Sequence, residues 1–172
     1  MPIAAPHLLR QPFCPETAGA DSYPTITHHM KQTEAVAAES IRNELLLHVR
    51  RMTRNEGLAV AKTFYAELFS RCPDLGKHFA GLDLDTQATK LWNVLRLVVA
   101  SDGDAAGLGE AVNHVARRHV LRGVKPQDYT AFTAVLIDVL AYSQRVVPPE
   151  QAKQIWSHEI HAVTSMILAR HH

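Results

Sequence analysis

The sequence is poor in cysteine: Cys14 and Cys72 are the two cysteines among 172 residues. Two cysteines cannot build a disulfide scaffold or a four-cysteine zinc site. Cys72 precedes Pro73 at a predicted helix end and is interpreted as a partly buried free thiol. Histidine, by contrast, occurs 11 times. A metal bound by this chain is therefore expected to be held by histidine.

Long apolar runs are also missing. The most apolar segment, residues 129–137, has nine residues without a charge and is closed by Asp138. A membrane-spanning helix needs about 20, so no membrane span is expected. The N-terminus lacks a secretory pattern, because Arg10 interrupts its mildly apolar start and no basic region precedes it. Together with the sparse cysteines, this predicts a cytoplasmic location.

An excess of either charge is absent. Lys and Arg number 18, Asp and Glu number 17, and the formal net charge is +1. This balance argues against nucleic acid as a partner and against a polybasic membrane anchor. Apolar residues make up 47% and charged residues 20%, which is typical of a soluble globular protein. The length fits one domain.

The sequence also shows no strand-like alternation, and its prolines are concentrated at one end. Five of the nine prolines lie in residues 1–33, where no helical period can be traced. We interpret residues 1–33 as a flexible proline-rich arm and residues 34–172 as one domain.

Helical periods follow one another from residue 33 onward, as in Ala37, Ile41, Leu45 and Val49 at intervals of four. Breaks are expected at residues 55–57, at Cys72–Pro73 and at Gly123, and Asp85 is the expected N-cap of a later helix. The pattern predicts an all-α fold of six or more helices. They are expected over residues 33–54, 58–71, 86–101, 111–119, from 126 and from 148.

His119 shares an apolar stripe with Val112 and Val115, at i, i+3 and i+7. A buried imidazole needs partners for its ring nitrogens. One interpretation is a core histidine bonded to a backbone carbonyl, and the other is an axial metal ligand in an apolar pocket. His114 lies about 100° away from Val115, toward the solvent side.

Two polar residues repeat this pattern on other helices. Gln87 lies one turn before Leu91 on an otherwise apolar face, either where the stripe meets the surface or as a donor aimed into a pocket. Tyr65 lies among apolar residues and needs a partner for its hydroxyl, either a backbone carbonyl or a ligand.

Four segments, taken in order, resemble the globins, specifically the bacterial single-domain globins and the haem domain of flavohaemoglobins. They are Phe64-Tyr-Ala-Glu-Leu-Phe69, Pro73-Asp-Leu-Gly-Lys-His-Phe79, Gln87-Ala-Thr-Lys-Leu91 and His119-Val-Leu-Arg-Gly-Val-Lys-Pro-Gln-Asp-Tyr129. The resemblance covers roughly residues 38–170. It implies a globin fold of helices stacked three on three, with haem b as cofactor.

On the distal side of that haem, the resemblance implies a pocket for bound gas. Tyr65 and Gln87 correspond to the distal pair, and Leu91 to the apolar wall beside the gas. Phe79 corresponds to the corner phenylalanine that packs on the porphyrin. The neighbouring His78 is a further residue that could turn toward the haem edge.

On the proximal side, His119 corresponds to the histidine that binds the iron. Tyr129 corresponds to a tyrosine beneath it, and Lys90 to a residue that can reach a haem propionate. Haem iron needs a neutral imidazole on one side and an open position on the other, and the inward phase of His119 agrees with that role.

The implied function is reversible binding of oxygen and other diatomic gases, nitric oxide and carbon monoxide among them. Hydrogen bonds from Tyr65 and Gln87 would each stabilise bound oxygen by about 1–3 kcal/mol, which predicts slow release. Nitric oxide dioxygenation is the chemistry expected beyond binding, and it would need an external reductase. Flavohaemoglobins carry their own reductase after the globin, whereas this chain stops at His172; their proximal glutamate aligns just past that residue. The alternative is a haem-based gas or redox sensor acting through a protein partner.

Overall fold

The computed structural model describes residues 24–101 and 105–170, and over these ranges it contains helices and no strands. The predicted all-α fold is thereby confirmed. The elements are α1 (Pro24–Arg51), α2 (Arg54–Arg71), the 3-10 helix η1 (Pro73–Phe79), α3 (Leu84–Ser101), α4 (Ala105–Leu121), α5 (Pro126–Ser143) and α6 (Pro149–Leu168).

The chain divides into two units, the first ending at Val36 and the second beginning at Ala37. Within the first unit, α1 begins at Pro24, nine residues before the start that the apolar period predicted at Thr33. Proline is tolerated in a first turn because its missing N–H would have no helical partner there. The prediction of a flexible arm therefore does not hold for residues 24–33, and its remaining part, residues 1–23, lies outside the described residues.

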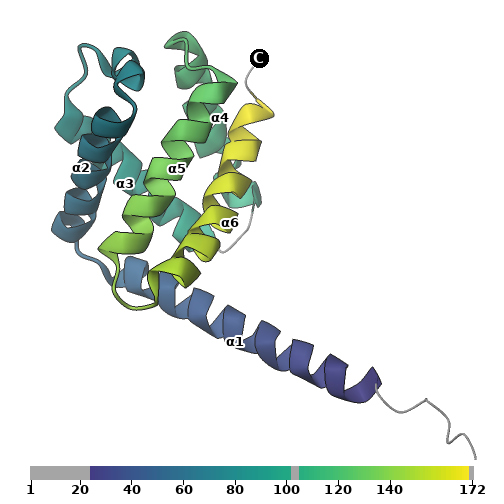
Figure 1. The fold of residues 1–172 in the computed structure, drawn as a ribbon. Helices are drawn as coiled ribbons and strands as arrows, with labels where there is room; N and C mark the ends of the chain where they lie inside the picture. Colours follow the sequence, from purple (N-terminus) through teal and green to yellow (C-terminus); the bar gives the residue numbers. More distant parts are fainter. Residues whose placement is uncertain (1–23, 102–104, 171–172) are drawn as a thin grey trace, which may run out of the picture. The chain divides into compact units, whose positions relative to one another are not determined.

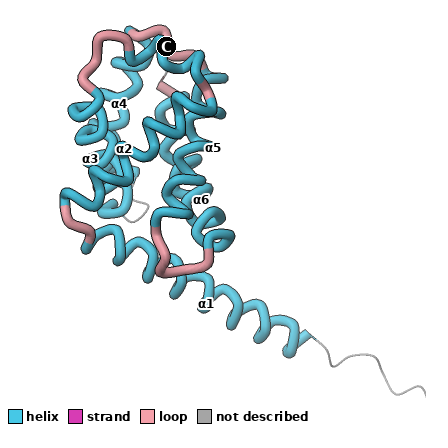
Figure 2. The backbone as a smooth tube through the Cα atoms, turned by 60° about the vertical axis from the view of Figure 1, so that its left-hand side comes forward, coloured by secondary structure: helices cyan, strands magenta, loops and turns pink. Residues whose placement is uncertain are grey.

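The second unit is built around α5, which packs against both α2 and α6. In Figure 1, α3 and α4 lie behind these helices, and α2 also packs on α3 and η1. Figure 2 shows that the loops of this unit gather at the two ends of its helices. The α4–α5 turn and the segment after η1 share one of these ends, so residues near both can meet.

The core of the second unit consists of two clusters of buried side chains. The larger one includes Phe64, Tyr65, Trp92 and Leu140, and Phe79 and Leu91 pack against it. The smaller one joins α3, α4, α5 and α6 and contains Val98, Leu108, Val112, Ala116, Tyr129 and Ile167. The predicted distal and proximal residues thus belong to different clusters.

The sequence predicted a helix break at residues 55–57, but Gly57 lies within a helix. It lies in the first turn of α2, which starts after a capping box in which Thr53 and Glu56 bond reciprocally. The ring of Trp92, on α3, occupies the space that a Cβ at Gly57 would need. Glycine is required here for the close approach of α2 and α3, and it is not a stop signal.

The N-cap of α3 also differs from the predicted one. Asp83, not Asp85, is the cap: its carboxylate accepts from the backbone N–H of Thr86 at 2.9 Å. Asp85 instead pairs with Lys62 on the surface at 2.9 Å. Hydrogen bonds from Thr86 hold the pKa of Asp83 below its usual range, so the cap remains charged at neutral pH.

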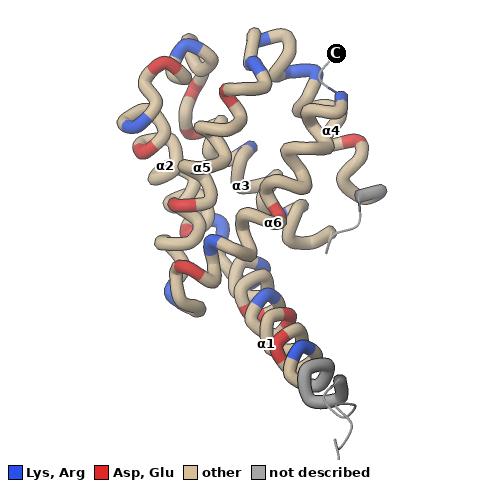
Figure 3. The backbone as a smooth tube through the Cα atoms, turned by 45° about the vertical axis from the view of Figure 1, so that its right-hand side comes forward, with Lys and Arg blue, Asp and Glu red and all other residues tan. Residues whose placement is uncertain are grey.

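Charged residues of both signs intermix along α1 and α2 in Figure 3. Over residues 24–101 and 105–170, none of the helices is long and apolar enough to cross a membrane.

We expect Gly57→Ala to lower the free energy of unfolding by about 1–3 kcal/mol, because the added methyl group would overlap the Trp92 ring. Gly109→Ala is the matched control, since open space surrounds Gly109 in α4. Removing a helical glycine there should raise stability by about 0.5–1 kcal/mol. Urea denaturation followed by circular dichroism measures both, and equal shifts would contradict the packing role of Gly57.

Candidate functional site

Tyr65 lies at the centre of a cluster of aromatic rings. Its ring meets Phe64 at 5.0 Å and Phe79 at 5.3 Å between centroids, both in edge-to-face geometry. Phe69, one turn after Tyr65 on α2, lies 6.0 Å from Tyr65 and 5.3 Å from Phe79. The structure therefore brings Tyr65 and Phe79 together. Phe69 was not singled out from the sequence, although its i+4 spacing from Tyr65 was the available signal.

The hydroxyl of Tyr65 donates to the backbone carbonyl of Gln87 at 3.5 Å, which is at the long limit for a hydrogen bond. Tyr65 is 7% exposed, and this burial raises its pKa far above the usual value. The hydroxyl thus keeps its proton at any physiological pH. Because its present bond is weak, turning that proton to another acceptor costs little.

The three predicted site residues of α3 have different environments. Gln87 is half-buried and follows the Asp83 cap, and its own N–H bonds the Asp83 carbonyl at 3.0 Å. Leu91, one turn later, is half-buried against the larger cluster. Lys90 is exposed. The helix therefore places the Gln87 carbonyl next to Tyr65, Leu91 against the larger cluster and Lys90 at the surface.

His119 and Tyr129 form a second group, on α4 and α5. The Nδ1 atom of His119 lies 2.8 Å from the hydroxyl of Tyr129, and the ring centroids are 5.6 Å apart. His119 is half-buried beside Val112 and Val115, which pack in the smaller cluster. One partner of Nδ1 is thus a side-chain hydroxyl.

Tyr129 is 5% exposed. Burial, with a smaller contribution from the neighbouring Asp128 carboxylate, raises its pKa to about 12. A neutral phenol can accept a hydrogen bond from Nδ1–H of His119, and that tautomer carries its lone pair on Nε2. A partner on one ring nitrogen that fixes tautomer and orientation is usual for metal-ligating histidines.

Among the described residues, no group of three or more His, Cys, Asp or Glu side chains is placed to hold a metal ion.

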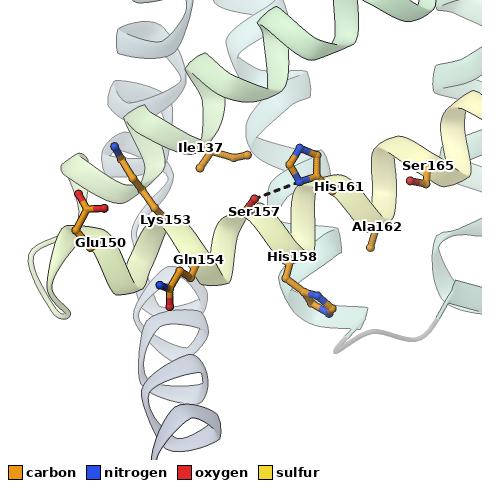
Figure 4. Close-up of a pocket in the computed structure, with 9 residues that line it drawn as sticks. All are labelled: Ile137, Glu150, Lys153, Gln154, Ser157, His158, His161, Ala162 and Ser165. Atoms are coloured by element: carbon orange, nitrogen blue, oxygen red, sulfur yellow. Dashed lines mark hydrogen bonds between the residues drawn. The ribbon is translucent and has the colours of Figure 1, made fainter.

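Two open grooves lie on α5 and α6. One, of about 800 Å³, is lined mainly by α6 residues, with Ile137 from α5; Figure 4 shows His161 bonded to Ser157 on its wall. The other, of about 480 Å³, includes Tyr129 among its lining residues. Neither lining contains Tyr65, Phe79, Gln87 or His119.

Comparison with known proteins identifies the family of the chain. The family model for globins matches residues 62–167, more than half of the chain, and this range holds every predicted site residue. The chain belongs to the globin family. It is 28% identical over 105 residues to an uncharacterized globin-like protein of Aquifex aeolicus (strain VF5), a match covering 61% of this chain and 73% of that protein. Globins are haem proteins that bind diatomic gases, and the predicted globin resemblance and fold are confirmed.

Proposed function

We propose that this globin binds one haem b through His119 and uses it to bind oxygen, nitric oxide and carbon monoxide reversibly. Haem, when bound, would supply an iron atom that binds the gas, and His119 would hold that iron. The observation that carries the proposal is the 2.8 Å contact between His119 Nδ1 and the Tyr129 hydroxyl. Such a contact would hold the orientation of the imidazole, as is usual for metal-ligating histidines.

The chemistry of the other site residues is compatible with haem. The core is divided between two clusters, one with the distal residues and one with Tyr129. A flat apolar cofactor between α3 and α4 would contact both of them. Phe79 and Leu91 would then offer apolar contact to the porphyrin, and Lys90, exposed on α3, has the charge and reach to meet a propionate.

On the gas side, Tyr65 and the Gln87 side chain would donate hydrogen bonds to bound oxygen, which carries partial negative charge. Tyr65 can do so at small cost, because its bond to the Gln87 carbonyl is 3.5 Å long. Carbon monoxide is less polar and would gain less from these donors.

Slow oxygen release favours chemistry over delivery, and we propose nitric oxide dioxygenation as that chemistry. With haem bound, the site would supply the chemistry that converts nitric oxide and oxygen into nitrate, and each turnover would consume one electron. That electron has to come from an external reductase. Tyr65 and Gln87 would hold the oxygen until nitric oxide arrives.

His119→Ala should abolish stable axial ligation, which the absorption spectrum of the haem-reconstituted, reduced protein reports with and without carbon monoxide. His114→Ala is the matched control, since His114 is exposed on the same helix. A wild-type protein without a Soret band after haem addition would rule out haem binding. Unchanged spectra of the His119 variant would move the ligand to another residue.

Tyr65→Phe should accelerate oxygen dissociation by about ten-fold to a hundred-fold, the rate equivalent of a lost hydrogen bond to a charged acceptor. Carbon monoxide dissociation should change much less. Stopped-flow displacement of oxygen by carbon monoxide measures the first rate. An unchanged oxygen rate would exclude Tyr65 from the distal bond.

With an added reductase and reductant, the oxygenated protein should consume nitric oxide over many turnovers and release nitrate in equal amount. Tyr65→Phe should lower this yield, because oxygen would leave before nitric oxide arrives. Consumption of a single equivalent, with binding of a protein partner that depends on the gas, would instead favour the sensor function.

A further inference from the structure

His78 lies in η1, directly before Phe79, and is 8% exposed. Its Nδ1 lies 3.2 Å from the backbone carbonyl of Arg122, and its Nε2 lies 3.0 Å from Oδ2 of Asp128. Both partners belong to the turn between α4 and α5 or to the first turn of α5. The ring therefore points to this turn and not to the haem side suggested by its position in the sequence.

The two partners of the His78 ring are both hydrogen-bond acceptors. A backbone carbonyl and a carboxylate only accept hydrogen bonds. A neutral imidazole carries one N–H and can satisfy one of them, whereas the imidazolium ion carries two and satisfies both. The geometry on the two sides of the ring therefore favours the doubly protonated form of His78.

Further hydrogen bonds surround this contact. Arg122 donates from Nη1 to the carbonyl of His78 at 3.2 Å, so the two residues bond reciprocally. The N–H of Lys125 donates to the same oxygen of Asp128 at 2.8 Å. The Lys125 N–H first, and then the His78 ring, hold the pKa of the Asp128 carboxyl below its usual range. The turn itself passes through Gly123, at a φ of +68°.

The backbone positions next to this contact carry both halves of the site. Phe79, after His78, packs edge to face on Tyr65 at 5.3 Å. Tyr129, after Asp128, contacts His119 at 2.8 Å. The His78 ring bonds Arg122 and Asp128, and Arg122 in turn donates its backbone N–H to the carbonyl of His119 at 3.1 Å. His78 thus acts through other residues and is a positioning residue.

We propose that His78, as an imidazolium ion, clamps η1 to the α4–α5 turn and so fixes Phe79 and the His119–Tyr129 pair relative to each other. This proposal rests on the proposed haem site. It assigns to His78 the role of coupling the proximal geometry to the distal pocket. A variant that weakens the clamp on one side should therefore change the geometry on the other side as well.

The charged groups facing the ring are Asp128 from α5 and Arg122 from the turn, and Lys77 is adjacent in η1.

The first test needs no haem. Nitrogen-15 NMR of the full-length protein at neutral pH, with the His78 signals assigned by their loss in His78→Gln, should show both ring nitrogens protonated. Asp128→Asn should return the ring to a neutral tautomer, while Asp138→Asn should not. Asp138 is the matched control because it lies on the same helix and pairs with Arg71 and Lys153 instead. A neutral ring in the wild type would overturn the clamp, whether or not haem binds.

The second test uses the haem-reconstituted protein. Both His78→Gln and Asp128→Asn should shift the iron–histidine stretching frequency in resonance Raman spectra and accelerate haem transfer to a scavenging apoprotein by about tenfold. The double variant should match the single variants, because each breaks the same link.

Additive effects, or effects equal to those of Asp138→Asn, would contradict the clamp and leave His78 a structural residue. A wild-type protein that binds no haem would instead defeat the proposed function, and the NMR result would still decide the state of His78.

Discussion

The burial of α5 between α2 and α6 is the constraint on which the rest of the second unit depends. Val135, Leu136, Val139 and Leu140 are almost fully buried on this helix, and it packs on both neighbours. This explains the nine-residue run without a charge, since a helix covered on several sides has little surface to give to charged residues. The start of α5 carries Asp128 and Tyr129, so the same packing also positions the proximal side of the site.

Two buried tyrosines show how the fold sets the chemistry. Burial raises the pKa of both Tyr65 and Tyr129, so each hydroxyl keeps its proton, but the partners differ. Tyr129 has a short contact to a ring nitrogen, whereas Tyr65 has a long contact to a carbonyl. The first arrangement holds a residue in place, and the second leaves a donor that can turn to a ligand.

The sequence predicted the helices better than their ends. The residue before Pro73 does end a helix, and Gly123 does form a left-handed turn, because both effects are local backbone sterics. The predictions of a helix break at Gly57 and of an N-cap at Asp85 were wrong. The role of Gly57 depends on a tryptophan 35 positions further along the chain, and the choice between Asp83 and Asp85 as cap depends on where α3 begins.

By itself, the sequence determined the all-α fold and the phase of His119 on its helix, since these follow from the helical period. It also determined the globin family, through the resemblance of four segments to that family. Only the tertiary structure decided which partners the site residues have: the hydroxyl of Tyr129 for His119, the Gln87 carbonyl for Tyr65, and the Arg122 carbonyl with Asp128 for His78. Hydrogen bonds have a reach of about 3 Å, and no pattern along one helix specifies which group of another helix lies within it.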